Sequence, residues 1–292
     1  MKEIFSPHIP NYIKELEKFG VGNFSEQETE EKLQIINMEL SKRNVLENPF
    51  LSVVVPAHKE EGVILATMLS LAKQSYKNVE FIFVVNGEEK NAKTEKMLQR
   101  AGFTVIYDEM PNIANARQKG AEQANGEFII NTDADTLHPE DWLKNWAQKI
   151  KEKHLIRGAS TTRSLSSKFL PNFFIEGFSV TYFIRQKLLG NWALTGVDEA
   201  NSFVDKNELI RAGGWNPKVR LGEGYDLFKR LPKGDESDTI YFDENLKVYT
   251  SGRRYEEQDP VPLFITLIKQ AVLRSVFQKE PELTNKDYGD YR

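Results

Sequence analysis

The chain has 292 residues, which is enough for one large domain or for a domain with appendages, and its content of 40% hydrophobic and 28% charged residues is typical of a soluble globular protein. A formal net charge of -4 at pH 7 gives no general electrostatic footprint for nucleic acid, so we expect no nucleic-acid partner. The absence of cysteine excludes disulfides, thiolate nucleophiles and cysteine-ligated zinc, and it fits a reducing compartment. Neither a signal-peptide pattern nor an uncharged apolar stretch of about 18 residues occurs, so the sequence predicts a cytoplasmic protein.

Residues 1–48 are expected to form an N-terminal helical extension. Ser25 and Glu28 stand three residues apart, as in a capping box, and an apolar stripe with helical spacing runs from Leu33 to Leu40. We interpret this segment as a packing helix without chemistry of its own.

From residue 50 onward, short apolar runs rich in β-branched and aromatic residues alternate with helical patterns. The predicted strands cover residues 51–55, 80–85, 103–107 and 127–131. This alternation predicts an α/β domain, in which helices flank a mainly parallel sheet. The loops after parallel strands meet at one edge of the sheet, where such folds bind ligands.

The remainder of the chain is less regular. We assign residues 49–255 to one domain, with a nucleotide-binding half (49–150) and an acceptor half (151–255), and we interpret the aromatic stretch 169–183 as core. Residues 256–292 are expected to form a C-terminal helical segment that is basic and amphipathic. Such a helix either packs on the domain or lies on an anionic lipid surface, and the second case would place the protein at the inner face of the membrane.

Two aspartates, Asp133 and Asp135, directly follow the last predicted strand of the first half, in "GEFIINTDADTLHPEDW". Residues i and i+2 of an extended segment point the same way, so both carboxylates can converge on one ligand. Carboxylates suit Mg²⁺ and Mn²⁺, which also bind water and substrate phosphates, so the pair predicts a site for a metal-bound diphosphate. His58 and His138 are interpreted as polar loop residues rather than metal ligands. The loop "PAHKEEG" after the first strand lacks the glycine pattern of dinucleotide-binding and P-loop enzymes, which argues against both.

Several segments together resemble the family-2 glycosyltransferases, which have the GT-A fold. The first strand ends in "VVVPAHKEE", and "NIANARQKGAEQANGEFIINTDADT" is similar to the family's Ala-Arg helix, apolar strand and Asp-Ala-Asp. Downstream, "IRAGGW", "GEGYDLFKRL" and "TSGRR" continue the resemblance, which covers about residues 50–255. It implies an enzyme that moves a sugar from a nucleotide-diphosphate sugar to an acceptor hydroxyl with inversion, using Mn²⁺ or Mg²⁺. The acceptor stays open between a glycan, a lipid-linked glycan and a small molecule.

The resemblance also implies roles for individual residues. Those that would bind the nucleotide sugar are Pro56, Ala57, Glu60, Asn86, Arg117, Asp133, Arg253 and Arg254. Asp135 would ligate the metal directly, and Asp133 would face both the metal and the ribose. Asn86 stands where the family often has aspartate, and because an amide both donates and accepts, the nucleotide base stays open. For Arg253 and Arg254, the sequence leaves open whether the side chains contact a phosphate or lie in a solvated turn.

The chain departs from the family at the expected catalytic base. The family begins this helix with adjacent glutamate and aspartate, the second acting as the base, but here Gly224 takes the place of the aspartate. We predict Glu223 as the base, with Asp226 as the alternative and Asp198 or Glu199 as further candidates. The incomplete acidic motif also leaves open a catalytically inactive sugar-nucleotide-binding or regulatory protein of the same fold. A nucleotidyltransferase is disfavoured, because its glycine- and basic-rich loop after the first strand is missing.

Overall fold

A computed structural model describes residues 9–42, 49–87, 89, 92–166, 199–219, 222–231 and 241–253 of the chain. In this part of the chain, eight strands form one sheet in the order β3-β2-β1-β4-β7-β6-β8-β5. The strands are β1 (Leu51–Ala57), β2 (Val79–Asn86), β3 (Thr104–Asp108), β4 (Phe128–Asn131), β5 (Thr136–Leu137), β6 (Arg157–Ser164), β7 (Ser202–Asp205) and β8 (Tyr241–Thr250).

The first four strands are those that the sequence predicts, and they are parallel. β1 pairs with both β2 and β4, and β2 pairs with β3. All seven residues of β1 are buried, because helices cover both faces of this central strand. The helices between these strands are α3 (Ile64–Ala72), α4 (Lys93–Arg100) and α5 (Ile113–Gln123).

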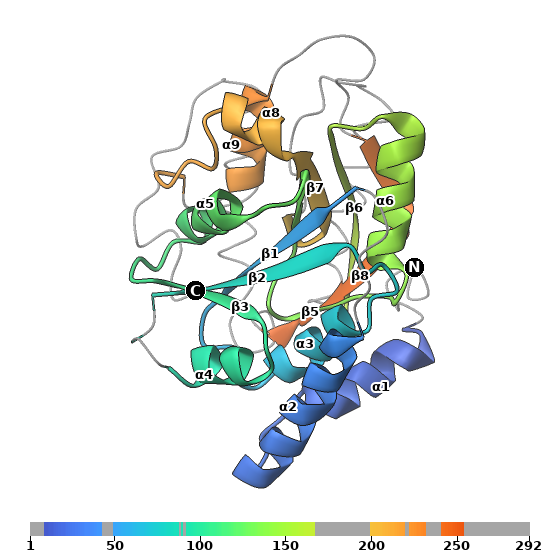
Figure 1. The fold of residues 1–292 in the computed structure, drawn as a ribbon, viewed down its shortest axis with the longest axis vertical. Helices are drawn as coiled ribbons and strands as arrows, with labels where there is room; N and C mark the ends of the chain where they lie inside the picture. Colours follow the sequence, from blue (N-terminus) through green and yellow to red (C-terminus); the bar gives the residue numbers. More distant parts are fainter. Residues whose placement is uncertain are drawn as a thin grey trace.

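Helices pack on both faces of the sheet (Figure 1). On one face, Val53 and Val55 of β1 contact the core formed with α3 and with α6 (Trp142–Lys153). On the other face, Val54 of β1 joins a smaller core with α5, α8 (Lys206–Arg211) and α9 (Glu223–Arg230). α5 lies very close to β1, since a Cβ added at Gly120 would come within 2.4 Å of a Val54 methyl group.

The second half of the sheet is mixed rather than parallel. β7 runs antiparallel to both β4 and β6, β6 is parallel to β8, and β5 is antiparallel to β8. β7 follows the short 3₁₀ turn η2 (Glu199–Asn201), and its first residue, Ser202, lies opposite Asn131, the last residue of β4. The α/β fold with flanking helices is confirmed, with its parallel part limited to β1–β4 and the β6–β8 pair.

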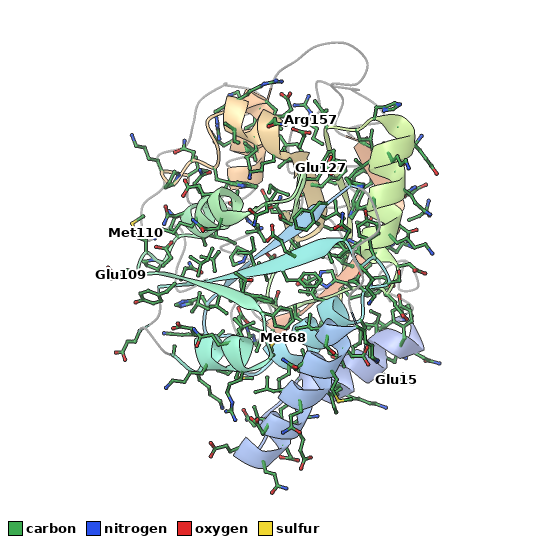
Figure 2. All side chains as sticks on the ribbon, viewed as in Figure 1. Glu15, Met68, Glu109, Met110, Glu127 and Arg157 are labelled. Carbon is green, nitrogen blue, oxygen red and sulfur yellow. The ribbon has the colours of Figure 1, made fainter. Side chains whose placement is uncertain are left out.

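The N-terminal segment forms two helices, α1 (Asn11–Gly20) and α2 (Glu26–Ser41), and both pack on α3. The predicted capping box is present: Ser25 Oγ accepts from the Glu28 amide at 3.2 Å, and Glu28 Oε2 accepts from the Ser25 amide at 2.8 Å. Figure 2 shows Met68 between α3 and the sheet, whereas Glu15 on α1 points away from the molecule.

Several predictions fall on residues outside the described part of the chain. They concern the aromatic stretch 169–183, Asp198, Arg254 and the C-terminal segment 256–292. Among the helices that the structure does describe, none has the length and hydropathy needed to span a bilayer.

Candidate active site

The carboxyl ends of β1, β2, β3 and β4 lie at one edge of the sheet. The parallel register places Ala57 of β1 beside Val85 of β2, and Asn86 beside Asp108 of β3. Beyond β4, the Thr132 amide donates to the carbonyl of Val54 on β1 at 3.3 Å. The loops that carry Glu60, Asn86, Asp133 and Asp135 therefore all leave from the same edge, as the sequence predicts for a ligand site.

A buried arginine joins α5 to this edge. The side chain of Arg117 is 1% exposed, and its Nη2 donates to Asp133 Oδ1 at 2.8 Å. Its Nε lies 3.9 Å from Glu223 Oε1 on α9, and its guanidinium carbon lies 5.7 Å from the centre of the Trp215 ring. The structure thus brings together three residues that the sequence assigns to the site, Arg117, Asp133 and Glu223.

Two donors of this guanidinium find no hydrogen-bond acceptor in the part of the chain that the structure describes. Within the described residues, Nε and Nη1 of Arg117 are buried and make no hydrogen bond. An unsatisfied buried donor costs about 1–3 kcal/mol, and more when the group is charged. Asp133 beside it is 35% exposed, so the cluster opens to solvent on that side. Oxygen acceptors on a bound ligand would satisfy these donors.

The loop from residue 132 to residue 138 carries both aspartates and is held at its two ends. Thr132 Oγ1 lies 2.7 Å from His138 Nε2, and Ser70 Oγ on α3 lies 3.0 Å from His138 Nδ1. The His138 ring packs against Trp142 with centroids 4.2 Å apart. Burial lowers the pKa of His138 from 6.5 to about 3, so its imidazole is neutral at physiological pH.

Asp135 contacts the end of β8. Its Oδ1 accepts from Thr250 Oγ1 at 3.2 Å, and its backbone carbonyl accepts from the Ser251 amide at 3.0 Å. Two residues further along, Arg253 Nη2 donates to Glu60 Oε2 at 2.6 Å. Glu60 and Arg253, both predicted to bind the nucleotide sugar, therefore contact each other across the same edge.

The donor atoms at this edge fit a metal ion that takes few protein ligands. No group of three or more His, Asp or Glu side chains converges as a metal cage among residues 9–253 where the structure describes them. Asp133 and Asp135 are instead two partly exposed carboxylates separated by one buried alanine. Mg²⁺ commonly binds through one or two carboxylates, with water and substrate phosphates completing the shell.

The candidate bases differ in their surroundings. Asp226 Oδ2 accepts from Arg230 Nε at 3.0 Å and from Arg230 Nη2 at 2.7 Å. Glu223 is 6% exposed and faces Arg117. Glu199 lies in η2, and its Oε1 accepts from the amide of Gly224 at 2.5 Å.

The remaining predicted residues lie at the carboxyl ends of the first two strands. Pro56 and Ala57 are buried at the end of β1, where they pair with Val84 and Val85. Asn86 is buried at the end of β2, and its carbonyl lies 2.7 Å from His58 Nδ1.

Sequence reasoning missed several partners of the predicted residues. Trp215 was visible in "IRAGGW" but not linked to Arg117, and Thr250 was not linked to Asp135. Asn201 was also missed: its Oδ1 accepts from Trp142 Nε1 at 2.9 Å and from Trp146 Nε1 at 3.2 Å. These contacts join segments that are distant in sequence, so no local pattern reports them.

Comparison with known proteins adds to this geometry. Glycosyltransferase GlyA of Streptococcus pneumoniae is 27% identical over 212 residues, which cover 70% of this chain and 30% of GlyA. A solved structure of the mannosyltransferase PcManGT from Pyrobaculum calidifontis, in complex with GDP-Man and Mn²⁺, superposes with a TM-score of 0.59 at 14% identity, covering 89% of this chain and 78% of that one. Staphylococcus aureus TarS 1–349 in complex with UDP-GlcNAc gives a TM-score of 0.53 at 16% identity, covering 78% and 69%.

At these identities the solved structures establish the GT-A fold. Three curated relatives match this chain over 28% to 36% of their own length. The sequence profile of Glycosyl transferase family 2 matches residues 52–206, which is more than half of the chain and includes Arg117, Asp133 and Asp135. The chain therefore belongs to glycosyl transferase family 2.

Proposed function

We propose that the protein transfers a sugar from a nucleotide-diphosphate sugar to an acceptor hydroxyl, with inversion at the anomeric carbon. The observation that carries this proposal is the Arg117–Asp133 pair, where a buried guanidinium has two donors that find no acceptor among the described residues and lies beside carboxylates at the ligand edge. A nucleotide diphosphate offers oxygen acceptors for such donors. Two proteins with this fold, solved in complex with GDP-Man and with UDP-GlcNAc, support this class of donor.

The residues at the edge divide into nucleotide and metal positions. Pro56, Ala57, Glu60 and Asn86 would form the nucleotide side, and Arg253 with Arg254 would reach the phosphates. Asp133 and Asp135 would hold Mn²⁺ or Mg²⁺, and Arg117 fixes the orientation of the Asp133 carboxylate. When bound, the metal ion would neutralise negative charge that develops on the departing diphosphate.

On the acceptor side, a carboxylate accepts the proton of the attacking hydroxyl. Because attack comes from the face opposite the leaving diphosphate, a single displacement gives inversion without a covalent intermediate. The sequence predicts Glu223 for this base, and this assignment is supported by the position of Glu223 at the start of α9, where its Oε1 lies 3.9 Å from Arg117 Nε.

The metal assignment predicts that Asp135→Ala abolishes Mn²⁺-dependent nucleotide-sugar binding while the fold survives. Asp135 is a partly exposed loop residue whose carboxylate accepts from the Thr250 hydroxyl, so its loss costs little stability. Isothermal titration calorimetry with UDP- and GDP-sugars, with and without Mn²⁺, measures the effect. Glu140→Ala, an exposed carboxylate five residues further along, is the matched control and should bind as the unmodified protein does. Unchanged Mn²⁺-dependent binding in Asp135→Ala would show that the metal lies elsewhere.

A second function is a sugar-nucleotide-binding or regulatory protein without transfer activity. It is favoured by the glycine at position 224, which replaces the aspartate of the expected acidic motif, and by the pairing of Asp226, the alternative base, with Arg230. Binding of a nucleotide sugar without release of nucleoside diphosphate, across a broad panel of donors and acceptors, would select this function over transfer.

We also propose that the C-terminal segment, residues 256–292, binds an anionic lipid surface. Co-sedimentation with anionic vesicles, compared between the whole chain and a chain ending at residue 255, tests it. Equal sedimentation of the two chains would remove this segment as a membrane contact.

A further inference from the structure

We propose that Glu60 is a positioning residue: it does not contact the nucleotide itself but orients Arg253, which contacts the diphosphate. This inference rests on the proposed function and deepens it, because it gives different roles to two residues that the sequence assigns together to the nucleotide sugar. It depends on the ion pair between the loop after β1 and the turn after β8.

The pair joins a buried carboxylate to a partly exposed guanidinium. Arg253 Nη2 donates to Glu60 Oε2 at 2.6 Å. The Glu60 side chain is 4% exposed, whereas the Arg253 side chain is 30% exposed. A ligand that enters from solvent therefore meets the guanidinium of this pair rather than the carboxylate. A hydrogen bond between two charged groups is also strong enough to fix the direction of the arginine.

The backbone of Glu60 is held by two helices. Its carbonyl accepts from the amides of Val63 at 3.0 Å and Ile64 at 2.8 Å, where the chain enters α3. Its own amide donates at 3.3 Å to the hydroxyl of Thr94, a fully buried residue in the first turn of α4. The carboxylate is therefore a fixed acceptor. An arginine bonded to it loses rotamer freedom before the ligand arrives, which lowers the entropy cost of binding.

The N-terminal helices support the same loop. The Gly22 amide, between α1 and α2, donates to the carbonyl of Gly62 at 2.9 Å. Gly62 lies two residues after Glu60, so the N-terminal extension contacts the segment that holds the carboxylate in place. The helices thus help to hold the donor loop without supplying a ligand-binding side chain.

Arg253 lies on a turn that is bonded to the predicted metal loop. Thr250 Oγ1 donates to Asp135 Oδ1 at 3.2 Å, and the Ser251 amide donates to the Asp135 carbonyl at 3.0 Å. The Arg253 amide in turn donates to Ser251 Oγ at 3.2 Å. A diphosphate held by a metal ion at Asp135 would lie beside this turn, which favours a phosphate contact by Arg253.

The chemistry of the two groups agrees with this division. A carboxylate repels the negatively charged oxygens of a diphosphate, whereas the planar guanidinium matches phosphate geometry. The bond to Glu60 uses one of the several N–H donors of Arg253, so the same guanidinium can bond to Glu60 and to phosphate oxygens at once. The alternative is that Glu60 accepts directly from the nucleoside, for which the almost completely covered carboxylate is poorly placed.

A double-mutant cycle in the full chain tests the inference through the Kd for UDP and GDP, measured by calorimetry with Mn²⁺. We expect Glu60→Ala to raise this Kd about tenfold, the effect of one charged hydrogen bond, and Arg253→Ala to raise it at least as much. The double variant should bind as Arg253→Ala does, because no arginine is left to orient. An equal effect of Glu60→Ala in both backgrounds would show that Glu60 acts independently of Arg253, and would overturn the inference.

Uridine and guanosine, which lack phosphates, give a second test. Their Kd should be the same within about twofold for Glu60→Ala, Arg253→Ala and the unmodified chain, although the diphosphates bind more weakly to both variants. Glu60→Gln keeps the size of the side chain and an oxygen that accepts from Arg253, so it should retain most of the affinity for UDP and GDP. Weaker binding of the nucleosides to Glu60→Gln would show that the carboxylate contacts the nucleoside directly, and would overturn the inference.

Glu61→Ala is the matched control. Glu61 is the partly exposed neighbour of Glu60 and lines a small cavity with residues of α2 and α4, so this variant should bind all four ligands as the unmodified chain does. Binding by the unmodified chain together with an additive cycle would contradict this inference alone. Failure of the unmodified chain to bind any nucleoside or nucleotide would contradict the proposed function, and this inference with it.

Discussion

His138 is the residue whose chemistry most directly affects the loop bearing Asp133 and Asp135. Its two ring nitrogens contact Ser70 and Thr132, and Ser70 Oγ also donates to the carbonyl of Thr67 at 2.8 Å. Because the single Ser70 hydroxyl proton is used by Thr67, Nδ1 of His138 carries the ring proton and Nε2 accepts from Thr132. This assignment requires a neutral imidazole, in agreement with its lowered pKa.

The lowered pKa of His138 predicts a loss of stability in mild acid. Burial lowers the pKa from 6.5 to about 3, so below pH 6.5 the unfolded chain binds a proton that the folded chain does not. The free energy of unfolding therefore rises with pH over this window and falls by about 1.4 kcal/mol per pH unit as the pH drops from 6.5 toward 3. Between pH 6.5 and 4.5, this one residue contributes a loss of about 2–3 kcal/mol.

Urea unfolding of His138→Asn over pH 4.5–7.5 checks this prediction. The variant should be less stable than the unmodified chain at pH 7, but its stability should fall less on acidification. His154→Asn is the control, because His154 is an exposed residue in the left-handed conformation after α6, which asparagine tolerates. Parallel stability curves for the unmodified chain and His138→Asn would contradict the buried neutral imidazole.

At the scale of elements, the close packing of α1 on α3 depends on one glycine. Gly20 ends α1, and a Cβ added there would lie 2.0 Å from the Ala66 amide nitrogen and 2.5 Å from the Leu65 carbonyl carbon. These are backbone atoms of α3, which cannot move as a flexible side chain can. The two helices can therefore pack this closely only with glycine at this position.

Gly20→Ala is expected to destabilise the protein by about 1–3 kcal/mol, the usual cost of overpacking, although alanine is the better helix former by about 1 kcal/mol. Gly62→Ala, where an added Cβ meets nothing within 4 Å, is the matched control and should be neutral or slightly stabilising. Chemical denaturation of both variants measures the difference. A Gly20→Ala protein as stable as Gly62→Ala would show that α1 does not pack on α3 as described.

The sequence predicts some elements better than others, because only some of them have a regular local pattern of apolar residues. β1 to β4 are continuous apolar runs, so their predicted positions agree with the structure to within two residues at each end. α6 could have been predicted, because Trp142, Trp146 and Ile150 recur at four-residue spacing. β8 could not have been predicted in this way, because buried and exposed residues do not alternate regularly along it. Its register against β6 also shifts between Ser160 and Thr162.

The same distinction holds for the candidate site. Arg117, Asp133 and Asp135 lie in one continuous motif, so the resemblance to the family is enough to group them. The contact between Glu199 and Gly224 spans 25 residues and depends on how η2 meets α9. The sequence shows that position 224 is glycine rather than a carboxylate, but it does not show that the Glu199 side chain lies beside this glycine.

At the scale of the whole molecule, the two halves of the sheet contribute different residues to the candidate site. The parallel half supplies the loops with Glu60, Asn86, Asp133 and Asp135, all from carboxyl strand ends. The mixed half supplies Glu199 from the turn before β7, and Thr250 with Arg253 from the end of β8. Because β7 runs antiparallel to β4, the turn before β7 lies at the same edge of the sheet as the carboxyl end of β4.

The N-terminal helices belong to the main core, so removing residues 1–48 is expected to prevent folding of the remaining chain. All nine residues of α3 are buried, and Ile13, Leu16, Leu33 and Ile36 are part of the same core cluster. Burial of four such side chains contributes about 6–12 kcal/mol, which is comparable with the total stability of about 5–15 kcal/mol for a domain. Without α1 and α2, the outer side of α3 would expose a large apolar patch.

Expression of residues 49–292 beside the full chain tests this expectation. The truncated chain should be found in the insoluble fraction or, if soluble, should show no cooperative urea transition and should bind a hydrophobic dye. Ile35→Ala and Met38→Ala are the controls, since both side chains are exposed on α2 and their loss should change the free energy of unfolding by less than about 0.5 kcal/mol. A truncated chain that unfolds at the same urea midpoint as the full chain would show that residues 1–48 are an independent appendage, because a helix pair that contributes to the core cannot be removed without lowering that midpoint.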